Sequence, residues 1–183
     1  MIVFISGGAR SGKSSFAETQ ALSSYNNSKD IDPKSKLTYI ATAKKVDIEM
    51  KRRIQIHQQS RANCWHTLEE PYDIFSILLN AREGDVILLD CLTIWLSNMM
   101  FDLNYDIEKL TKTVGNWVEI VKQKQIVFFI VSNDVNEGYP LPYKSVHNYI
   151  YYLESLHQFI INNVDQAIQL IAGIPVYWKG EVK

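Results

Sequence analysis

The first fourteen residues constrain the fold more than any other part of the chain. An apolar run, Ile2–Ile5, leads into Gly7-Gly8-Ala9-Arg10-Ser11-Gly12-Lys13-Ser14, and a helical pattern follows directly. A strand, a loop of the form G-x-x-x-x-G-K-S and a helix, in this order, are typical of a phosphate-binding P-loop. The alternative is an ordinary glycine-rich turn between a strand and a helix. The presence of all three parts in the required order favours the P-loop.

Each part of this loop has a physical role in binding phosphate. Glycines let successive backbone N–H groups turn toward phosphate oxygens, and the start of the helix adds its positive dipole end. We expect Lys13 to reach the β- and γ-phosphates as a catalytic residue, and Ser14 to bind Mg²⁺. The expected nucleotide site therefore comprises Gly7, Gly8, Ala9, Arg10, Ser11, Gly12, Lys13, Ser14 and Ser15.

Strand-like apolar runs alternate with helical patterns along the rest of the chain. Strands are expected at 2–5, 37–41, 85–90, 126–131, 167–171 and 175–178, helices at 12–25, 46–61, 71–81, 92–101, 107–124 and 145–163, and loops at 26–36 and 133–143. This alternation predicts an α/β sandwich of three layers with a mostly parallel sheet. The length of 183 residues fits a single domain over 1–183. Because ligands bind at the carboxyl ends of strands in such folds, we expect the P-loop, 41–43, Asp90 and 132–134 at one edge.

Composition excludes several classes of partner. The formal net charge is −1, so no overall basic field favours nucleic acid or an anionic membrane. No segment approaches the ~20 consecutive apolar residues of a membrane span, and no signal peptide is evident, so a cytoplasmic location is expected. Cys64 and Cys91 have neither the number of a disulfide framework nor the spacing of a zinc site.

Asp90 is the first acidic candidate, because it ends an apolar strand. A carboxylate in that position matches the second acidic element of P-loop enzymes, which holds Mg²⁺ directly or through water. The alternative is an Asp that caps the helix beginning at Leu92. Both roles are compatible with the sequence.

A basic stripe is expected on the helix at 46–61. Arg53, His57 and Arg61 recur at i, i+4 and i+8, so they share one face of that helix. Two neighbouring guanidinium groups disfavour the cationic form of His57, which leaves an imidazole nitrogen free to attack phosphorus, while the arginines clamp phosphate oxygens. From the residues alone, a solvated basic helix face remains the simpler interpretation.

Three further groups leave the choice open. Glu69 and Glu70 are candidates for a metal or a ribose hydroxyl, or for an acidic first turn that a helix dipole favours. The stretch 132–134 (Ser-Asn-Asp) either contacts ligand or forms a turn. The late helix carries aromatic side chains typical of a core or a subunit interface: His147, Tyr149, Tyr151, Tyr152 and His157. Trp95 and Trp178 are further candidates for an apolar interface.

These motifs together resemble one family, the bifunctional adenosylcobinamide kinase/adenosylcobinamide-phosphate guanylyltransferases of cobalamin nucleotide-loop assembly. The matching stretches are the loop Gly7–Ser14, Tyr39–Ala43, Glu49 and Met50 with Arg53, Ile54, His57, Arg61 and Trp65, Thr67–Pro71, Leu88–Asn98, and Gly173–Pro175. The resemblance is dense as far as Asn98 and thinner beyond it.

The resemblance implies a RecA-like P-loop NTPase fold, often assembled as a homotrimer. It implies phosphorylation of the aminopropanol hydroxyl of adenosylcobinamide from ATP or GTP, with Mg²⁺, and then transfer of GMP from GTP to that phosphate through a GMP–histidine intermediate. The family's histidine corresponds to His57. The resemblance makes Arg53, Arg61 and Glu69 nucleotide ligands and Asp90 and Ser14 metal ligands. The expected catalytic residues are then His57, Lys13 and Asp90. This reverses the simpler interpretation of the basic stripe.

The chain departs from the family pattern after residue 132. Where the family has N-E-V-G-x-G-I-V-P, this chain has Asn133-Asp134-Val135-Asn136-Glu137-Gly138-Tyr139-Pro140-Leu141-Pro142. Where the family has R-x-F-R-D on the late helix, residues 147–151 contain no arginine. Three alternatives therefore stay open: a divergent member with weak activity, a single retained activity, or another acceptor. A module that binds GTP without turnover is a separate alternative of another class.

Overall fold

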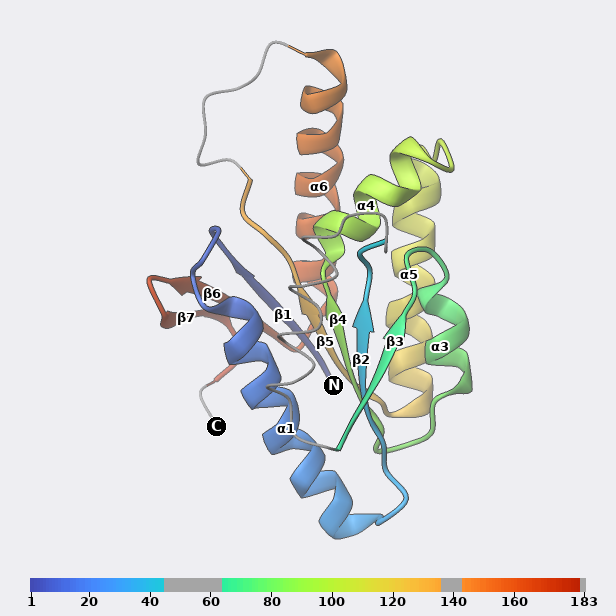
Figure 1. The fold of residues 1–183 in the computed structure, drawn as a ribbon, viewed down its shortest axis with the longest axis vertical. Coiled ribbons are helices and arrows are strands. Elements are labelled where there is room, and N and C mark those ends of the chain that lie inside the picture. The colour runs from blue at the N-terminus through green and yellow to red at the C-terminus, as the bar shows by residue number, and fades with distance from the viewer. Residues whose placement is uncertain (45–63, 136–142, 182–183) are drawn as a thin grey trace.

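A computed structural model describes residues 1–44, 64–135 and 143–181 of the chain. Within these ranges seven strands form one sheet in the order β3-β2-β4-β5-β1-β6-β7 (Figure 1). All neighbouring strands are parallel except β6 and β7, which form an antiparallel hairpin. The strands are β1 (Ile2–Gly7), β2 (Leu37–Ala41), β3 (Trp65–Glu69), β4 (Val86–Asp90), β5 (Val127–Val131), β6 (Gln166–Ile171) and β7 (Ile174–Lys179).

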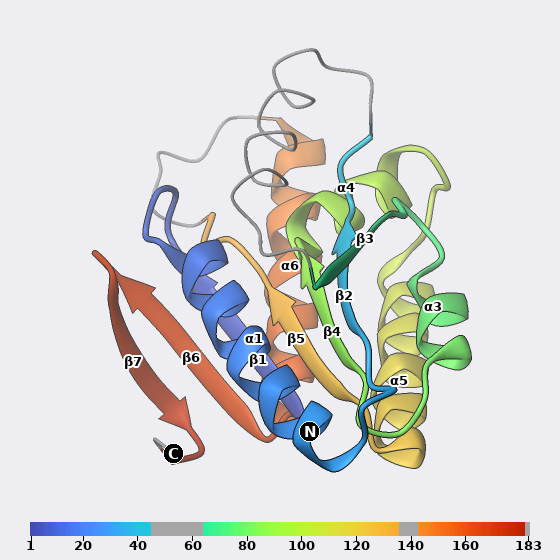
Figure 2. The same ribbon diagram turned by 60° about the horizontal axis from the view of Figure 1, so that its bottom comes forward.

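Helices cover both faces of the sheet, as the α/β prediction requires. In the described ranges they are α1 (Lys13–Ile31), α3 (Ile74–Asn80), α4 (Leu92–Phe101), α5 (Ile107–Lys124) and α6 (Lys144–Asn163). Helix α1 lies against one face, and α3, α4, α5 and α6 lie behind the other (Figures 1 and 2). The expected three layers are therefore present, with the sheet in the middle.

Two apolar cores follow from the alternation of side chains along the buried strands. On the α1 face, Val3, Ile5 and Leu88 pack with Ala17 and Ala21 of α1. The opposite face holds the larger core, which includes fully buried Trp95 and Trp117 with their rings 4.5 Å apart in an edge-on arrangement. The suggestion that Trp95 supplies an apolar interface is therefore wrong, because this side chain is inaccessible from outside.

Three elements differ clearly from the sequence prediction, and one of them is α3, which begins at Ile74 after its N-cap Asp73 although the helix was predicted from residue 71. Helix α1 continues to Ile31, although residues 26–36 are predicted as a loop. Residues 26–31 are mostly exposed, so no apolar periodicity marks this end of the helix. Strand β3 was not predicted, because it lies at the edge of the sheet and is at most half-buried, which removes the apolar run that identifies a central strand.

The carboxyl ends of the parallel strands gather the candidate residues as expected. The P-loop follows β1, Thr42 follows β2, Asp90 ends β4 and Ser132 follows β5. None of the helices in the described ranges has the length and apolar character needed to cross a membrane.

Candidate active site

The loop between β1 and α1 has the tight backbone that its glycines predict. A Cβ on Gly7 would lie 2.7 Å from the carbonyl oxygen of Leu170 on β6 and 2.6 Å from Ser11 Oγ, so only glycine fits there. Gly12 takes a left-handed conformation with φ of 87° and precedes the first residue of α1. The backbone N–H of Gly173, in the β6–β7 turn, donates to Ser11 O at 3.0 Å, which ties the loop to the hairpin.

The start of α1 offers backbone donors to an anion. The N-cap is Gly12, which has no side chain to accept from the first N–H groups of the helix. Those groups have no partner within the helix, and they carry the positive end of its dipole. This local geometry matches what a phosphate group requires.

Lys13 lies within the loop rather than in solvent. Its side chain is buried, and Nζ donates to Gly8 O at 3.0 Å. Ser14, the next residue, is half-buried on the first turn of α1, and Ser15 is exposed. Lys13 therefore holds a positive charge inside the curve of the loop, where a β- or γ-phosphate would meet it.

Asp90 and Glu69 lie on the same face of the sheet as α1. Ala41 of β2 is paired with Glu69 on one side and with Asp90 on the other. Residues two positions earlier, Tyr39 and Leu88, belong to the core packed on α1, which places this row on the α1 face. Because two strand spacings separate them, the Cα atoms of Glu69 and Asp90 are about 10 Å apart.

A phenol holds the Asp90 carboxylate. Tyr39 Oη donates to Asp90 Oδ2 at 2.6 Å, and Asp90 is half-buried. The N-cap of α4 is Cys91, with no side-chain cap, so the alternative of Asp90 as the cap of that helix is wrong. The peptide bond between Asp90 and Cys91 is cis. Burial, assisted by the charge of Asp90, raises the pKa of the Cys91 thiol to about 11, so this thiol stays protonated near neutral pH.

Buried polar side chains lock three strand ends together. Thr42 Oγ1 donates to Cys91 O and accepts from Cys91 N, both at 2.9 Å. Asn98 Nδ2, from α4, donates to Thr42 O at 2.9 Å and to Pro71 O at 3.2 Å. The roles of Tyr39, Thr42 and Asn98 were missed from the residues alone. The available signal was a polar residue inside an otherwise apolar strand or helix.

The two adjacent carboxylates of Glu69 and Glu70 have different surroundings. Glu70 Oε1 accepts from the backbone N–H groups of Tyr72 and Asp73, both at 2.9 Å. Glu70 therefore stabilises the turn before α3, but the predicted acidic first turn is wrong, because α3 begins at Ile74 and its first turn contains no acidic residue. Glu69 is exposed at the end of β3, on the face that carries Asp90.

The end of β5 is held by side chains from α6 and β6. Ser132 Oγ and His157 Nε2 are 2.7 Å apart, and Gln169 Nε2 donates to Asp134 Oδ2 at 2.9 Å. The backbone N–H of Asp134 also donates to Gly7 O at 3.0 Å. Burial lowers the pKa of His157 to about 4, although the charge of Asp134 opposes this shift.

The aromatic residues of α6 divide into two groups. His157, Tyr149 and Tyr152 are partly buried, and the two tyrosines pack against the larger core, as one of the sequence alternatives holds. His147 and Tyr151 are exposed. Arg53, His57 and Arg61, with the helix expected at 46–61, lie outside the described residues, as does 136–142 of the altered loop.

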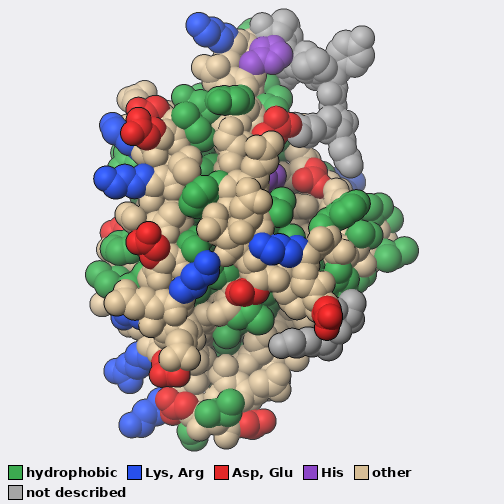
Figure 3. Space-filling model, turned by 180° about the vertical axis from the view of Figure 1, so that it is seen from behind, with side chains coloured by type: hydrophobic (Ala, Val, Ile, Leu, Met, Phe, Trp, Pro, Cys, Tyr) green, Lys and Arg blue, Asp and Glu red, His purple; other side chains and the backbone are tan. Residues whose placement is uncertain are grey.

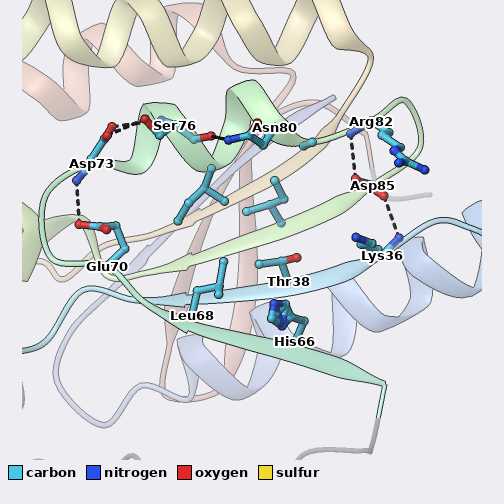
Figure 4. Close-up of a pocket in the computed structure, with 13 residues that line it drawn as sticks. Lys36, Thr38, His66, Leu68, Glu70, Asp73, Ser76, Asn80, Arg82 and Asp85 are labelled. Carbon is cyan, nitrogen blue, oxygen red and sulfur yellow. Dashed lines mark hydrogen bonds between the residues drawn. The ribbon is translucent and has the colours of Figure 1, made fainter.

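A cavity of about 310 Å³ lies between β3 and α3, away from the P-loop (Figure 4). Its aspartate side chains already accept hydrogen bonds from backbone N–H groups of this protein. Asp73 accepts from the backbone N–H of Ser76, and Asp85 accepts from the backbone N–H groups of Lys36 and Arg82 (Figure 4). Together with Glu70, these carboxylates hold the backbone before and after α3 by accepting its N–H groups. The acidic side chains of this cavity therefore have a structural role, and the cavity is separate from the sheet edge that carries the P-loop and Asp90.

The candidate Mg²⁺ ligands are a hydroxyl and a carboxylate. Oxygen ligands of this kind suit Mg²⁺, which commonly takes one or two protein ligands and shares the rest with water and nucleotide phosphates. Among the described residues no cluster of three or more His, Cys, Asp and Glu side chains is suited to a metal. Ser14 and Asp90 would each supply an oxygen atom to a metal ion that a bound nucleotide also holds.

Comparison with known proteins agrees with this architecture. The chain resembles the crystal structure of flagellar accessory protein FlaH from Methanocaldococcus jannaschii, with a TM-score of 0.50 and 14% identity, over 98% of this chain and 78% of that one. This likeness concerns the fold alone, and it agrees with the predicted α/β sandwich with a mostly parallel sheet.

Relatives of similar length carry the assignment further. The bifunctional adenosylcobalamin biosynthesis protein CobP of Pseudomonas aeruginosa is 35% identical over 178 residues, which cover 97% of this chain and 96% of CobP. The bifunctional adenosylcobalamin biosynthesis protein CobU of Salmonella typhimurium is 25% identical over 188 aligned positions, covering 96% of this chain and 98% of that protein. CobU of Escherichia coli is 35% identical over 107 residues, 58% of this chain and 54% of that protein. The family model "Cobinamide kinase / cobinamide phosphate guanyltransferase" matches residues 3–177, and the chain therefore belongs to this family of bifunctional transferases.

Proposed function

We propose that this chain phosphorylates the aminopropanol hydroxyl of adenosylcobinamide and then transfers GMP from GTP to the new phosphate. The observation that carries this proposal is that the candidate residues lie at one edge of the sheet. Lys13, the start of α1, Asp90 and Glu69 all lie at the carboxyl ends of strands that are ordered by direct pairing. A whole-chain family match supports the same two reactions.

In the kinase step the loop positions a nucleoside triphosphate. Backbone N–H groups at the start of α1 and the ammonium of Lys13 neutralise charge on the β- and γ-phosphates. The acceptor hydroxyl oxygen bonds to the γ-phosphorus, the bond from that phosphorus to the bridging oxygen breaks, and the hydroxyl proton leaves to solvent. Mg²⁺ on Ser14 and Asp90 would supply further charge neutralisation.

In the guanylyl transfer step His57 is the proposed nucleophile. Its neutral imidazole nitrogen attacks the α-phosphorus of GTP, and pyrophosphate leaves. A phosphate oxygen of cobinamide phosphate then attacks the same phosphorus, and the P–N bond breaks. Two easier displacements replace one difficult displacement. The proposed contacts of Arg53 and Arg61 with the nucleotide belong to the same step.

The test of this step uses GTP labelled at the α-phosphate. Incubation with Mg²⁺ followed by denaturation should leave acid-labile, alkali-stable label on the chain. His57→Ala should abolish the label, whereas His147→Ala should retain it, because His147 is an exposed histidine of α6 and does not occupy the position of the family's histidine. An unlabelled wild-type protein that still binds GTP would refute the covalent intermediate.

The kinase step is tested separately with ATP or GTP labelled at the γ-phosphate. Transfer of label to cobinamide is expected, and Lys13→Ala should reduce it at least a hundredfold, in line with the loss of a main electrostatic contact to the transition state. Label released only as inorganic phosphate in the presence of cobinamide would contradict this acceptor.

We further propose a homo-oligomer, a trimer by resemblance to the family. The hairpin of β6 and β7 exposes large apolar side chains, with Ile171 at 53%, Ile174 at 67% and Trp178 at 70% of their full exposure. Figure 3 shows an apolar group at the edge of the molecule formed by this hairpin. Sedimentation velocity should give a trimer that Ile174→Ser weakens. A monomer at micromolar concentration would contradict the proposal.

A further inference from the structure

A groove between α4 and α6 lies at the same edge of the sheet as the P-loop. We call it the α4–α6 groove, and its volume is about 460 Å³. This size is within the usual range for small-molecule sites. It is lined by Thr93, Ile94, Ser97 and Phe101 of α4, Asn133 and Val135 after β5, and Ser145, Val146 and Tyr149 of α6.

The chemistry of the groove differs from that of the P-loop. Its lining contains apolar and aromatic side chains with hydroxyl and amide groups between them, and no charged side chain among the described lining residues. A triphosphate would find no positive charge among these described residues. The cavity beside α3, by contrast, is lined by lysine, arginine, aspartate and glutamate. The α4–α6 groove therefore suits an uncharged organic surface with amide groups that exchange hydrogen bonds.

Hydrogen bonds connect the floor of this groove to the end of β4. Thr93 Oγ1 lies 2.8 Å from Cys91 Sγ and accepts from Asn133 Nδ2 at 3.3 Å. Tyr149 Oη donates to Thr93 O at 2.8 Å. Since Cys91 directly follows Asp90, these bonds fix the floor of the groove relative to the end of β4.

Aromatic rings form one wall. Phe101 and Tyr149 stack with ring centroids 6.4 Å apart and planes 19° apart. Phe101 is nevertheless 55% exposed, so an apolar ring at this wall faces the outside. Stacked, partly exposed rings favour contact with a flat conjugated ligand.

We propose that the α4–α6 groove is the acceptor subsite. In this arrangement an uncharged edge of the corrin ring, with its amide side chains, contacts Phe101, Ser97 and Asn133, and the arm bearing the hydroxyl or phosphate extends past Thr93 toward Asp90. Because the groove is smaller than a whole corrinoid, it holds only part of the acceptor. The inference rests on the proposed function, since the acceptor is the cobinamide named by the family.

Filling the groove tests the inference directly. Ser97→Phe places a large ring where a half-buried hydroxyl now lies, and Phe101→Ser removes the exposed wall without opening the core. Each has a matched control outside the groove: Ser155→Phe on α6, which is also half-buried, and Leu79→Ser on α3, which is 47% exposed.

The expected result separates acceptor from donor. Ser97→Phe should raise the KM for cobinamide at least tenfold, and Phe101→Ser threefold or more, while the KM for nucleotide and the labelling by α-labelled GTP without acceptor stay within twofold of wild type. The controls should change neither parameter. Equilibrium dialysis, followed by the visible absorbance of cobinamide, should show the same loss of binding.

Two results would overturn the inference, and they are distinguishable. If wild-type protein binds and phosphorylates cobinamide and both groove variants do so with unchanged KM, the acceptor lies elsewhere while the proposed function stands. If wild-type protein binds nucleotide but neither binds nor phosphorylates cobinamide, the proposed acceptor itself is wrong, and the inference fails with it. Phe101→Ser keeps the test valid if Ser97→Phe does not fold.

Discussion

The hydrogen bond from Tyr39 to Asp90 gives the sharpest test of the proposed metal site. Tyr39→Phe removes only the phenol oxygen that donates to Asp90 Oδ2 at 2.6 Å. The ring itself is retained, including its edge-on contact with Trp65 at 6.0 Å between centroids. The variant therefore isolates the orientation of one carboxylate.

The magnitude follows from the type of bond. A hydrogen bond to a charged group contributes about 1.5–3 kcal/mol. Asp90 is half-buried, so water replaces part of the lost donor, and we take the lower end of that range. A loss of about 1.4 kcal/mol corresponds to a factor of ten. We therefore expect the Mg²⁺ concentration for half-maximal kinase rate to rise about tenfold, in line with other partners of metal-binding carboxylates.

The assay is a Mg²⁺ titration of the initial rate at saturating nucleotide. Tyr72→Phe is the matched control, because Tyr72 Oη also donates to a carboxylate, that of Asp102, at 3.2 Å and away from the P-loop. Asp90→Asn serves as the full loss of charge. If Tyr39→Phe leaves the Mg²⁺ dependence at the wild-type value while Asp90→Asn abolishes the rate, the reasoning about orientation is wrong. If Asp90→Asn has no effect, the metal role of Asp90 is wrong.

Three further predictions concern the scaffold of the site. Gly7→Ala should lower the free energy of unfolding by about 1–3 kcal/mol and weaken nucleotide binding, because its Cβ would lie 2.7 Å from a backbone carbonyl oxygen of β6. Calorimetry and nucleotide titration measure the two effects. The control Gly115→Ala, whose Cβ would lie 3.6 Å from the nearest atom, should change neither. Because burial lowers the pKa of His157 to about 4 from 6.5, the unfolded chain binds the proton first, so stability should fall by about 2 kcal/mol between pH 7 and 4.5 and level off below pH 4. In urea unfolding, His157→Gln should lose most of this dependence while keeping a partner for Ser132, and an equal slope in both proteins would refute the assignment. Asn98→Ala should cost about 1–3 kcal/mol by stripping two backbone carbonyls of their donor, and a stability equal to wild type would show that water replaces it.

The parts of the fold predicted from sequence are those with strong local signals. Strand β2 and helices α4 and α5 have the predicted bounds, because each combines a run or period of apolar residues with a clear end. The N-cap of α5 is Asp106, whose carboxylate accepts from the backbone N–H of Lys109. The P-loop was predictable for the same reason, since glycines, lysine and serine act within a short stretch of chain.

Contacts between distant segments were not predictable from these patterns. Strand β3 pairs with β2 through backbone hydrogen bonds, and its exposed, mixed side chains give no apolar signal. Side chains alternate along β3, so once this strand is known, Glu69 and Glu70 must face opposite ways. Glu69 then lies on the Asp90 face, and Glu70 bonds to the backbone before α3.

Local periodicity and loop composition thus specified the layers, the glycine-rich loop before α1 and the edge of the sheet where the candidate residues gather. Only the tertiary structure placed Tyr39 against Asp90, Asn98 against Thr42, and α4 beside α6 to form a neutral groove. The physical reason is that periodicity reports which face of an element is buried, whereas hydrogen bonds and cavities depend on which elements become neighbours. Strand order decides that, and here β4 lies between β2 and β5 although β3 precedes it in the chain.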